Sequence, residues 1–309
     1  MAIEHTYYIC VHIMLSALLL STALQKPPLS CQPCTSRELL TSRDLLTRRQ
    51  ALLGVGCACF ACRPDAAFSL AAIKEPDAAQ LSRFATPRDA AKDKGFAAGM
   101  DSGMGSYEAA IGATKQRLFG QMLRAVPKAE PVVVELGMGT FPNAKFYATT
   151  GGPQRMDIVG VDPNDAMAPY AEKAAAGAGL AKLGHSVRTV NGLAEALPLA
   201  DRSADAVVCT LTLCSVADPA AAVAEVRRVL RPGGQFLFVE HVLSPTDALL
   251  ARQQRALTPL QVQSADGCHL DRETLQTVQA AGFSALDAEI FDLSGFWVLS
   301  PTAAGIAVS

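Results

Sequence analysis

The sequence has few of the features that indicate nucleic-acid binding, a disulfide framework or a metal site. Its 27 basic and 29 acidic residues leave a formal net charge of −2, which argues against a polyanion as the main partner. After residue 72 it has only Cys209, Cys214 and Cys268, too few for a disulfide framework. Cys31 and Cys34 have a metal-like spacing but no second pair, so we predict no metal site.

The length of 309 residues, half of them hydrophobic, is enough for one large domain with extensions. We predict a targeting leader over residues 1–72, an N-terminal extension with a helical lid over 73–130, and the main domain over 131–309. Within the extension, residues 73–104 should be partly ordered coil with short helices. The helical spacing over 107–125 favours core contacts for Phe119 and Met122 over a substrate site. We expect a monomer.

The leader contains no Lys, Arg, Asp or Glu between residues 6 and 25, a stretch long enough to span a bilayer or to act as a signal peptide. Residues 26–47 are rich in Ser, Thr and Pro, as in a plastid transit peptide. Arg48 and Arg49 precede a short apolar run, which resembles a twin-arginine export signal. Together these predict a plastid of a complex-plastid alga, in the thylakoid lumen or the stroma. The alternative is an anchor helix at residues 7–24 in the endoplasmic reticulum, with membrane association through the N-terminus.

The stretch 132–143 organises the rest of the chain. Three valines at 132–134 predict a buried strand, and Gly137 and Gly139 predict a tight turn whose backbone N–H groups can approach a ligand. The next strand ends on Asp162, where a carboxylate can accept hydrogen bonds from a ribose diol. Pro142 stands where a dinucleotide-binding turn has its third glycine. This pattern favours S-adenosylmethionine over NAD as the nucleoside bound there.

Along the main domain, apolar runs of strand length alternate with stretches of helical spacing. This alternation predicts an α/β fold with a doubly wound, mostly parallel seven-stranded sheet. The last two strands are close enough to form a hairpin, so one edge strand should be antiparallel. A helix beginning at Asp218 should end at Pro-Gly-Gly, residues 232–234. We expect strands near 132–134, 158–161, 186–190, 206–209, 235–239, 285–291 and 296–307, and further helices over 166–176 and 272–281.

Several motifs together resemble a known family. Val-Glu-Leu-Gly-Met-Gly-Thr at 134–140, Asp162, Ala-Glu-Ala-Leu-Pro at 194–198 and Leu-Arg-Pro-Gly-Gly at 230–234 resemble class I S-adenosylmethionine-dependent methyltransferases. The motifs at 208–216, 236–242 and 266–270 are similar to the methyltransferase-like proteins of microsomes and lipid droplets, which include thiol S-methyltransferases with plastid relatives. The resemblance implies a type 11 methyltransferase domain with a Rossmann-like fold, S-adenosylmethionine as cofactor and a small apolar thiol as acceptor.

The resemblance also implies site residues. Two positions depart from the family pattern: Phe141 stands where another glycine is usual, and Leu193 where many relatives have an adenine-binding Asp. A thiol acceptor also needs deprotonation, since its pKa lies near 8.5. His241, Asp266 and His269 are the candidate bases, although a hydrogen-bonded structural role is favoured for His241 over that of a base. The implied cofactor-binding residues are Glu135, Gly137, Met138, Gly139, Thr140, Asp162, Pro163, Leu193, Ala194, Thr210 and Leu211.

Two alternative functions remain open from the sequence. The first is a plastid methyltransferase that acts on carbon or oxygen of a quinone or lipid, because quinone C-methyltransferases share the same motifs. The second is a non-catalytic protein with a decayed cofactor site, since Phe141 could crowd the glycine turn.

Overall fold

The structure is a computed structural model that describes residues 73–127, 129–149 and 152–309. The leader at 1–72, with its predicted targeting signals and six of the cysteines, lies outside the described residues. Within the described ranges, every helix is too short or too polar to cross a membrane.

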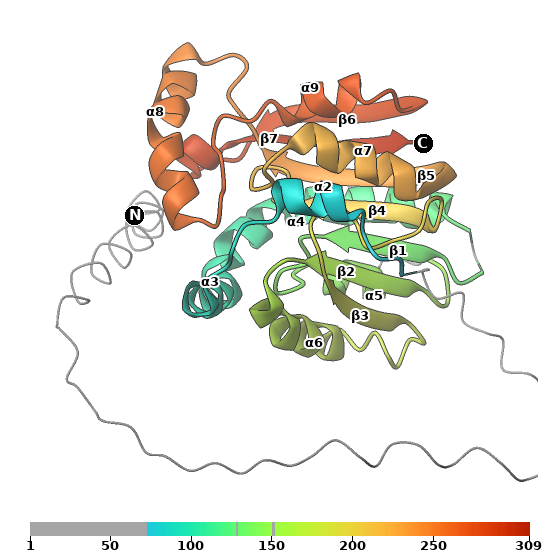
Figure 1. The fold of residues 1–309 in the computed structure, drawn as a ribbon. Coiled ribbons are helices and arrows are strands. Elements are labelled where there is room, and N and C mark those ends of the chain that lie inside the picture. The colour runs from blue at the N-terminus through green and yellow to red at the C-terminus, as the bar shows by residue number, and fades with distance from the viewer. Residues whose placement is uncertain (1–72, 128, 150–151) are drawn as a thin grey trace, which may run out of the picture.

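The described residues form a seven-stranded sheet in the order β3-β2-β1-β4-β5-β7-β6, with helices on both faces (Figure 1). The predicted α/β class with a doubly wound, mostly parallel sheet is thus confirmed. A single antiparallel strand was expected at an edge; β7 is that strand, and it lies one place in, between β5 and β6. The strands are β1 (Val132–Leu136), β2 (Asp157–Asp162), β3 (Ser186–Asn191), β4 (Ala204–Thr210), β5 (Leu230–His241), β6 (Ala285–Asp292) and β7 (Pro301–Val308).

The helices divide between the two faces of the sheet and its carboxyl edge. Apolar side chains of α4, α5 and α6 pack with one face, and those of α7 and α9 with the other. The predicted contacts of Phe119 and Met122 with the core are present, since both side chains are fully buried. The helices are α2 (Ala78–Phe84), α3 (Ala90–Gly103), α4 (Gly105–Ala125), α5 (Ala144–Thr149), α6 (Ala168–Gly177), α7 (Pro219–Val229), α8 (Ala248–Ser264) and α9 (Thr274–Ala280), with 3-10 turns η1 (Asp165–Met167) and η2 (Trp297–Leu299).

Helix α7 ends earlier than the sequence indicates. Asp218 caps its N-terminus as expected, accepting hydrogen bonds from the N–H groups of Ala220 and Ala221. The helix stops at Val229, however, and residues 232–234 lie inside β5, where the pairing with β4 shifts register. The Pro-Gly-Gly segment therefore forms the irregular start of a strand, and the helix ends before it.

The N-terminal extension covers part of the carboxyl edge of the sheet. Ile73 forms an isolated antiparallel bridge with Leu199, and Gln80 of α2 donates a hydrogen bond to the carbonyl of Glu195. Farther along, Asn164 donates to the carbonyl of Asp93 in α3 at 3.1 Å. Residues 73–103 are more helical than expected, and they rest on the two loops that follow β2 and β3.

Candidate functional site

The turn after β1 requires glycine at Gly137. Both Gly137 and Gly139 have positive φ, at 58° and 55°. A Cβ at Gly137 would lie 2.3 Å from Oγ1 of Thr212, whereas a Cβ at Gly139 would meet nothing closer than a carbonyl 3.8 Å away. The turn is therefore closed on the side of Thr212 and open above Gly139, which leaves backbone accessible to a ligand.

Asp162 joins this turn to the loop after β2. Its Oδ2 accepts a hydrogen bond from the N–H of Gly139 at 2.9 Å, and its Oδ1 accepts one from the N–H of Asn164 at 2.8 Å. Burial raises the pKa of Asp162, and these two hydrogen bonds act against that rise. Since each carboxylate oxygen can accept more than one hydrogen bond, the side chain keeps capacity for a ribose diol.

Glu135 lies at the centre of a buried polar network. The hydroxyl of Tyr147 donates to its Oε1 at 2.7 Å, and Nδ2 of Asn143 donates to its Oε2 at 3.1 Å. The same amide group lies 3.1 Å from Oγ1 of Thr210, so it connects β1 to the end of β4. Burial raises the pKa of Glu135 to about 7, although both hydrogen bonds favour the charged form.

The network extends to a lysine that the sequence analysis missed. Nζ of Lys115 is fully buried and donates to Oε1 of Glu108 at 2.7 Å and to Oδ1 of Asn143 at 3.0 Å. Lys115 and Glu108 both belong to α4, one heptad apart, so a shared helix face was the available signal. Through Asn143, this buried cation supports the residues at the carboxyl ends of β1 and β4.

Phe141 is accommodated in the core. Its φ of 61° explains why glycine is the usual residue there, because the left-handed region is costly for residues with a Cβ. The side chain is fully buried in the cluster beneath the turn, and its ring centroid lies 5.9 Å from that of Tyr147. Met138 is buried as well and fills the space above Gly160. The side chain of Met138 therefore packs the turn against β2.

The remaining predicted cofactor residues lie on loops at the carboxyl edge. Leu193 forms an isolated bridge with Ala196, a tight turn that buries Ala194. Leu211 follows Thr210 with φ 55°, and its N–H donates to the carbonyl of Val239 at 2.9 Å. The structure therefore brings the turn after β1, Asp162, the loop 192–198 and the end of β4 to one edge of the sheet. Thr140 and Pro163 are partly exposed on that edge.

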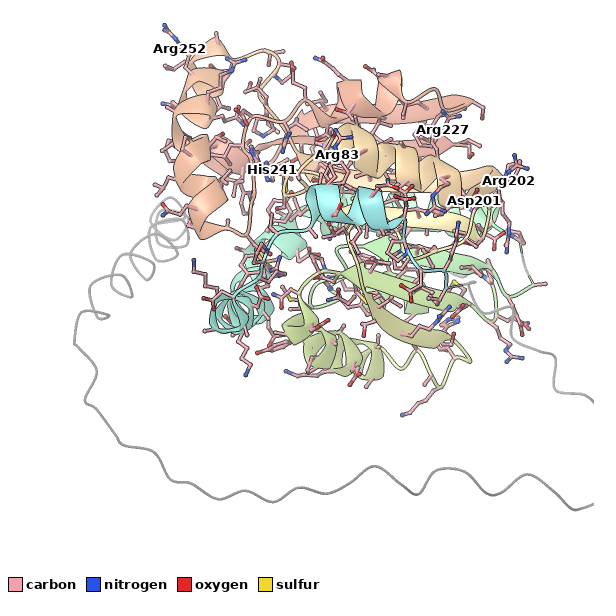
Figure 2. All side chains as sticks on the ribbon, viewed as in Figure 1. Arg83, Asp201, Arg202, Arg227, His241 and Arg252 are labelled. Atoms are coloured by element: carbon pink, nitrogen blue, oxygen red, sulfur yellow. The ribbon has the colours of Figure 1, made fainter. Side chains whose placement is uncertain are left out.

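The three candidate bases have different surroundings. His241 is buried at the end of β5, with Nε2 3.0 Å from Sγ of Cys268. Figure 2 shows it at the end of the sheet near α8, far from Asp201 and Arg202 at the opposite end.

Asp266 is exposed and paired with Arg88 at 3.0 Å. Nδ1 of His269 lies 2.8 Å from the carbonyl of Gly267. Arg88 and Asp266 lie close enough to Asp162 to influence its pKa in opposite directions. The Arg88–Asp266 pair therefore contributes to the electrostatic environment of the carboxylate expected to hold the ribose.

The arrangement fits S-adenosylmethionine on two observations. The space above Gly139 is open, and Asp162 lies beside it with unused acceptor capacity. In addition, Glu135 is a buried acid, and a positive charge nearby would favour its ionised form. S-adenosylmethionine is a cation and would supply that charge. When bound, the cofactor would supply a methyl group on a sulfonium sulfur, which leaves as a neutral thioether once the methyl group is transferred.

A mostly parallel sheet with a glycine turn after β1 and an acid ending β2 defines the nucleoside-binding class of α/β enzymes. Residues 134–238 match the family model described as a methyltransferase domain. The chain belongs to the class I S-adenosylmethionine-dependent methyltransferase family and is an enzyme of that kind.

Individual relatives agree with this family. The chain is 38% identical over 180 residues to Thiol S-methyltransferase TMT1B of Rattus norvegicus, covering 57% of this chain and 69% of the relative. It is 34% identical over 197 residues to Thiol S-methyltransferase TMT1A of Homo sapiens, covering 62% and 77%. A structure of a Haloferax volcanii complex between a methyltransferase activator and a methyltransferase matches with a TM-score of 0.51 at 18% identity, covering 72% of this chain and 99% of that one. That likeness concerns the fold alone.

Proposed function

We propose that this enzyme transfers the methyl group of S-adenosylmethionine to the sulfur of a small apolar thiol. The observation that carries the proposal is the 38% identity to a protein named as a thiol S-methyltransferase, over 69% of that protein's length.

The side chains near the carboxyl edge support an apolar acceptor. Met104, Leu211 and Phe296 are partly buried and pack against the core cluster that lies under the glycine turn. The ring of Tyr107 meets that of Phe296 edge-on, with centroids 5.3 Å apart. An apolar acceptor that covers these side chains would gain about 25 cal/mol for each Å² of apolar surface removed from water.

Placement of the two reactants is the main task of the protein in such a transfer. Orientation of bound reactants can supply ~7–11 kcal/mol of the barrier. Asp162 would orient the ribose, and the network of Glu135, Asn143 and Thr210 would hold the carboxyl ends of β1 and β4 in position. Deprotonation of the acceptor is an easy step, because a thiol with a pKa near 8.5 is already a few per cent ionised at neutral pH.

The test compares benzenethiol with phenol, which differ only in the nucleophilic atom. The full chain is incubated with tritiated S-adenosylmethionine and each acceptor, and the methylated product is identified by mass spectrometry. We expect thioanisole from benzenethiol and little anisole from phenol. Asp162→Ala should abolish turnover by weakening cofactor binding, whereas Asp287→Ala, at an exposed site on β6, should leave it unchanged.

Other outcomes overturn the proposal. Methyl transfer to the ring carbon of a quinol, without transfer to any thiol in a panel of aromatic and alkyl thiols, would assign the enzyme to carbon methylation. Equal rates with benzenethiol and phenol would show that sulfur is not what the site selects. Binding of S-adenosylmethionine, measured by calorimetry, separates a failed acceptor from a failed cofactor site.

A further inference from the structure

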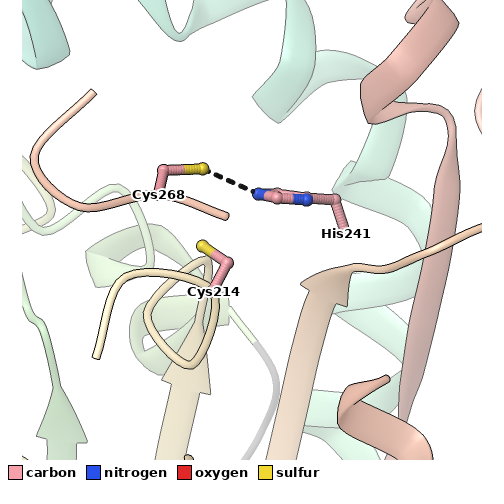
Figure 3. Close-up of side chains that lie close together, drawn as sticks. All are labelled: Cys214, His241 and Cys268. Carbon is pink, nitrogen blue, oxygen red and sulfur yellow. Dashed lines mark hydrogen bonds between the residues drawn. The ribbon is translucent and has the colours of Figure 1, made fainter. Parts of the chain in front are cut away.

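Three metal-ligating side chains converge beyond the ends of β4 and β5. Cys214, His241 and Cys268 are all buried, and their ligand atoms lie within 4.8 Å of one another. In Figure 3 the two sulfurs and the imidazole ring point toward a common centre. Sγ of Cys268 lies 3.0 Å from Nε2 of His241. The cluster thus has two sulfur atoms and one nitrogen around a single small volume.

Glu240 holds the loop that carries Cys214. This buried carboxylate accepts hydrogen bonds from the N–H groups of Thr212 at 2.8 Å, Leu213 at 3.1 Å and Cys214 at 3.2 Å. His241 follows Glu240 directly on β5, and its backbone pairs with Thr302 of β7. The main chain at Cys214 and at His241 is therefore held in place by hydrogen bonds that do not involve the side chains of the cluster.

Cys268 is presented by a tight turn that closes against the same loop. Asp266 and Gly267 both have positive φ, at 47° and 84°. A Cβ at Gly267 would come within 3.0 Å of the carbonyl of Ser215, so a side chain there would push the two loops apart. The N–H of His269 donates to the carbonyl of Cys214 at 2.8 Å and joins the loops on the other side of Cys268.

We propose that Cys214, His241 and Cys268 form a binding site for one zinc ion. Two cysteines and one histidine are a known ligand set for zinc, which takes thiolate sulfur at about 2.3 Å and imidazole nitrogen at about 2.0–2.1 Å. Two thiolates balance the charge of Zn²⁺, so the bound cluster is neutral in a buried environment. Three protein ligands leave the fourth tetrahedral position for water or another ligand.

The observed spacing requires little adjustment. With those bond lengths, ligand atoms on one tetrahedral zinc lie about 3.6–3.8 Å apart. The separation between His241 and Cys268 therefore has to open by roughly half an ångström, which side-chain rotation can provide. A ligating Nε2 has no lone pair left for a proton, so the site would remove His241 from the candidate bases.

The rival use of the cluster is a disulfide between Cys214 and Cys268. The convergence of all three groups favours zinc, because a disulfide would use only the two sulfurs. It would leave the buried His241 with no role, and Nδ1 of that ring already lacks a hydrogen-bond partner among the described residues. The disulfide is therefore an outcome of the test.

The first experiment measures zinc content. The full chain is purified without chelators, dialysed against metal-free buffer, and analysed for zinc by mass spectrometry. Cys268→Ser and His241→Asn should each retain one zinc equivalent fewer than the unmodified chain. Cys209→Ala is the matched control, since Cys209 is a buried cysteine in β4 outside the cluster, and it should retain zinc. Equal zinc content in all four proteins overturns the proposal.

The second experiment needs no variant and so does not depend on whether a variant folds. The native chain is treated with a thiol alkylating reagent with and without a strong chelator, and modification is mapped peptide by peptide. We expect Cys214 and Cys268 to be protected until the chelator removes zinc, and zinc release to accompany their modification. The leader cysteines fall on other peptides. Protection that the chelator does not change, or a peptide pair linked through Cys214 and Cys268, contradicts a zinc site.

Discussion

Replacement of Lys115 by methionine should strongly destabilise the protein. The change keeps the length of the side chain but removes an ammonium group that is fully buried. Glu108, whose side chain is 10% exposed, would keep its charge without its partner at 2.7 Å. Removal of one partner of a buried ion pair costs ~3–5 kcal/mol. Since Oε2 of Glu108 is also buried, with no hydrogen-bond partner among the described residues, we expect a loss of at least about 3 kcal/mol.

Urea unfolding of the full chain, followed by far-ultraviolet circular dichroism, measures this loss. Lys173→Met is the matched control, because Lys173 is 77% exposed and its distance of 3.9 Å to Asp101 makes a weak ion pair. Its free energy of unfolding should stay within about 0.5 kcal/mol of the unmodified chain. Lys115→Met combined with Glu108→Gln should recover much of the loss, since no charge is then left unpaired.

Two results would refute this reasoning. If Lys115→Met and Lys173→Met unfold at the same urea concentration, the buried ammonium does not stabilise the fold through Glu108. If the loss of stability in the double variant equals the sum of the losses in Lys115→Met and Glu108→Gln, the side chains of Lys115 and Glu108 act independently. A weaker affinity for S-adenosylmethionine in Lys115→Met, at temperatures where it stays folded, would show that the network through Asn143 reaches the cofactor site.

Two further predictions concern the glycine turn and Glu135. Gly137→Ala should lower the melting temperature more than Gly139→Ala, because both substitutions carry the left-handed strain of ~1–2 kcal/mol but only the first meets Thr212. Equal shifts in a thermal melt would show that the contact with Thr212 is relieved at no cost. For Glu135, a folded pKa of about 7 against 4.5 means that its contribution to stability is complete below pH 4.5 and is lost as pH rises through 7. Glu135→Gln should therefore flatten the pH dependence of the urea midpoint between those values, and an unchanged slope would contradict the raised pKa.

The sequence predicted the parts of the fold whose signal is local. Strands β1, β2 and β4 are runs of apolar residues buried on both faces, so their pattern is visible without tertiary context. Helix α4 likewise has apolar residues at helical spacing. Helix α8 was not expected, because its buried residues are Ala251, Gln254 and Thr258, which form no apolar stripe. Gln254 is held by hydrogen bonds to the carbonyls of Val242 and Val298, which only the folded chain brings near it.

Site residues were predictable from sequence where a short local motif determines the backbone geometry. Gly137, Gly139 and Asp162 are such positions, since a tight turn and a strand-ending acid can be recognised in sequence. Lys115 was not, because a lysine on a helix is ordinarily solvated, and only packing against Asn143 buries it. The cluster of Cys214, His241 and Cys268 was also hidden, because its members come from two loops and the end of β5, and only the folded chain brings them together.

The placement of the N-terminal extension limits where a peptidase could cut if the predicted leader is removed. Lys74 donates through its backbone N–H to the carbonyl of Pro198 at 3.1 Å, and Gln80 reaches the carbonyl of Glu195 six residues later. Both contacts hold the loop expected to meet the adenine. A peptidase that removes a leader must therefore cut before residue 73 to leave this cover intact. A cut within α2 would remove these contacts from the loop 192–198. We expect the shortened enzyme to bind S-adenosylmethionine more weakly.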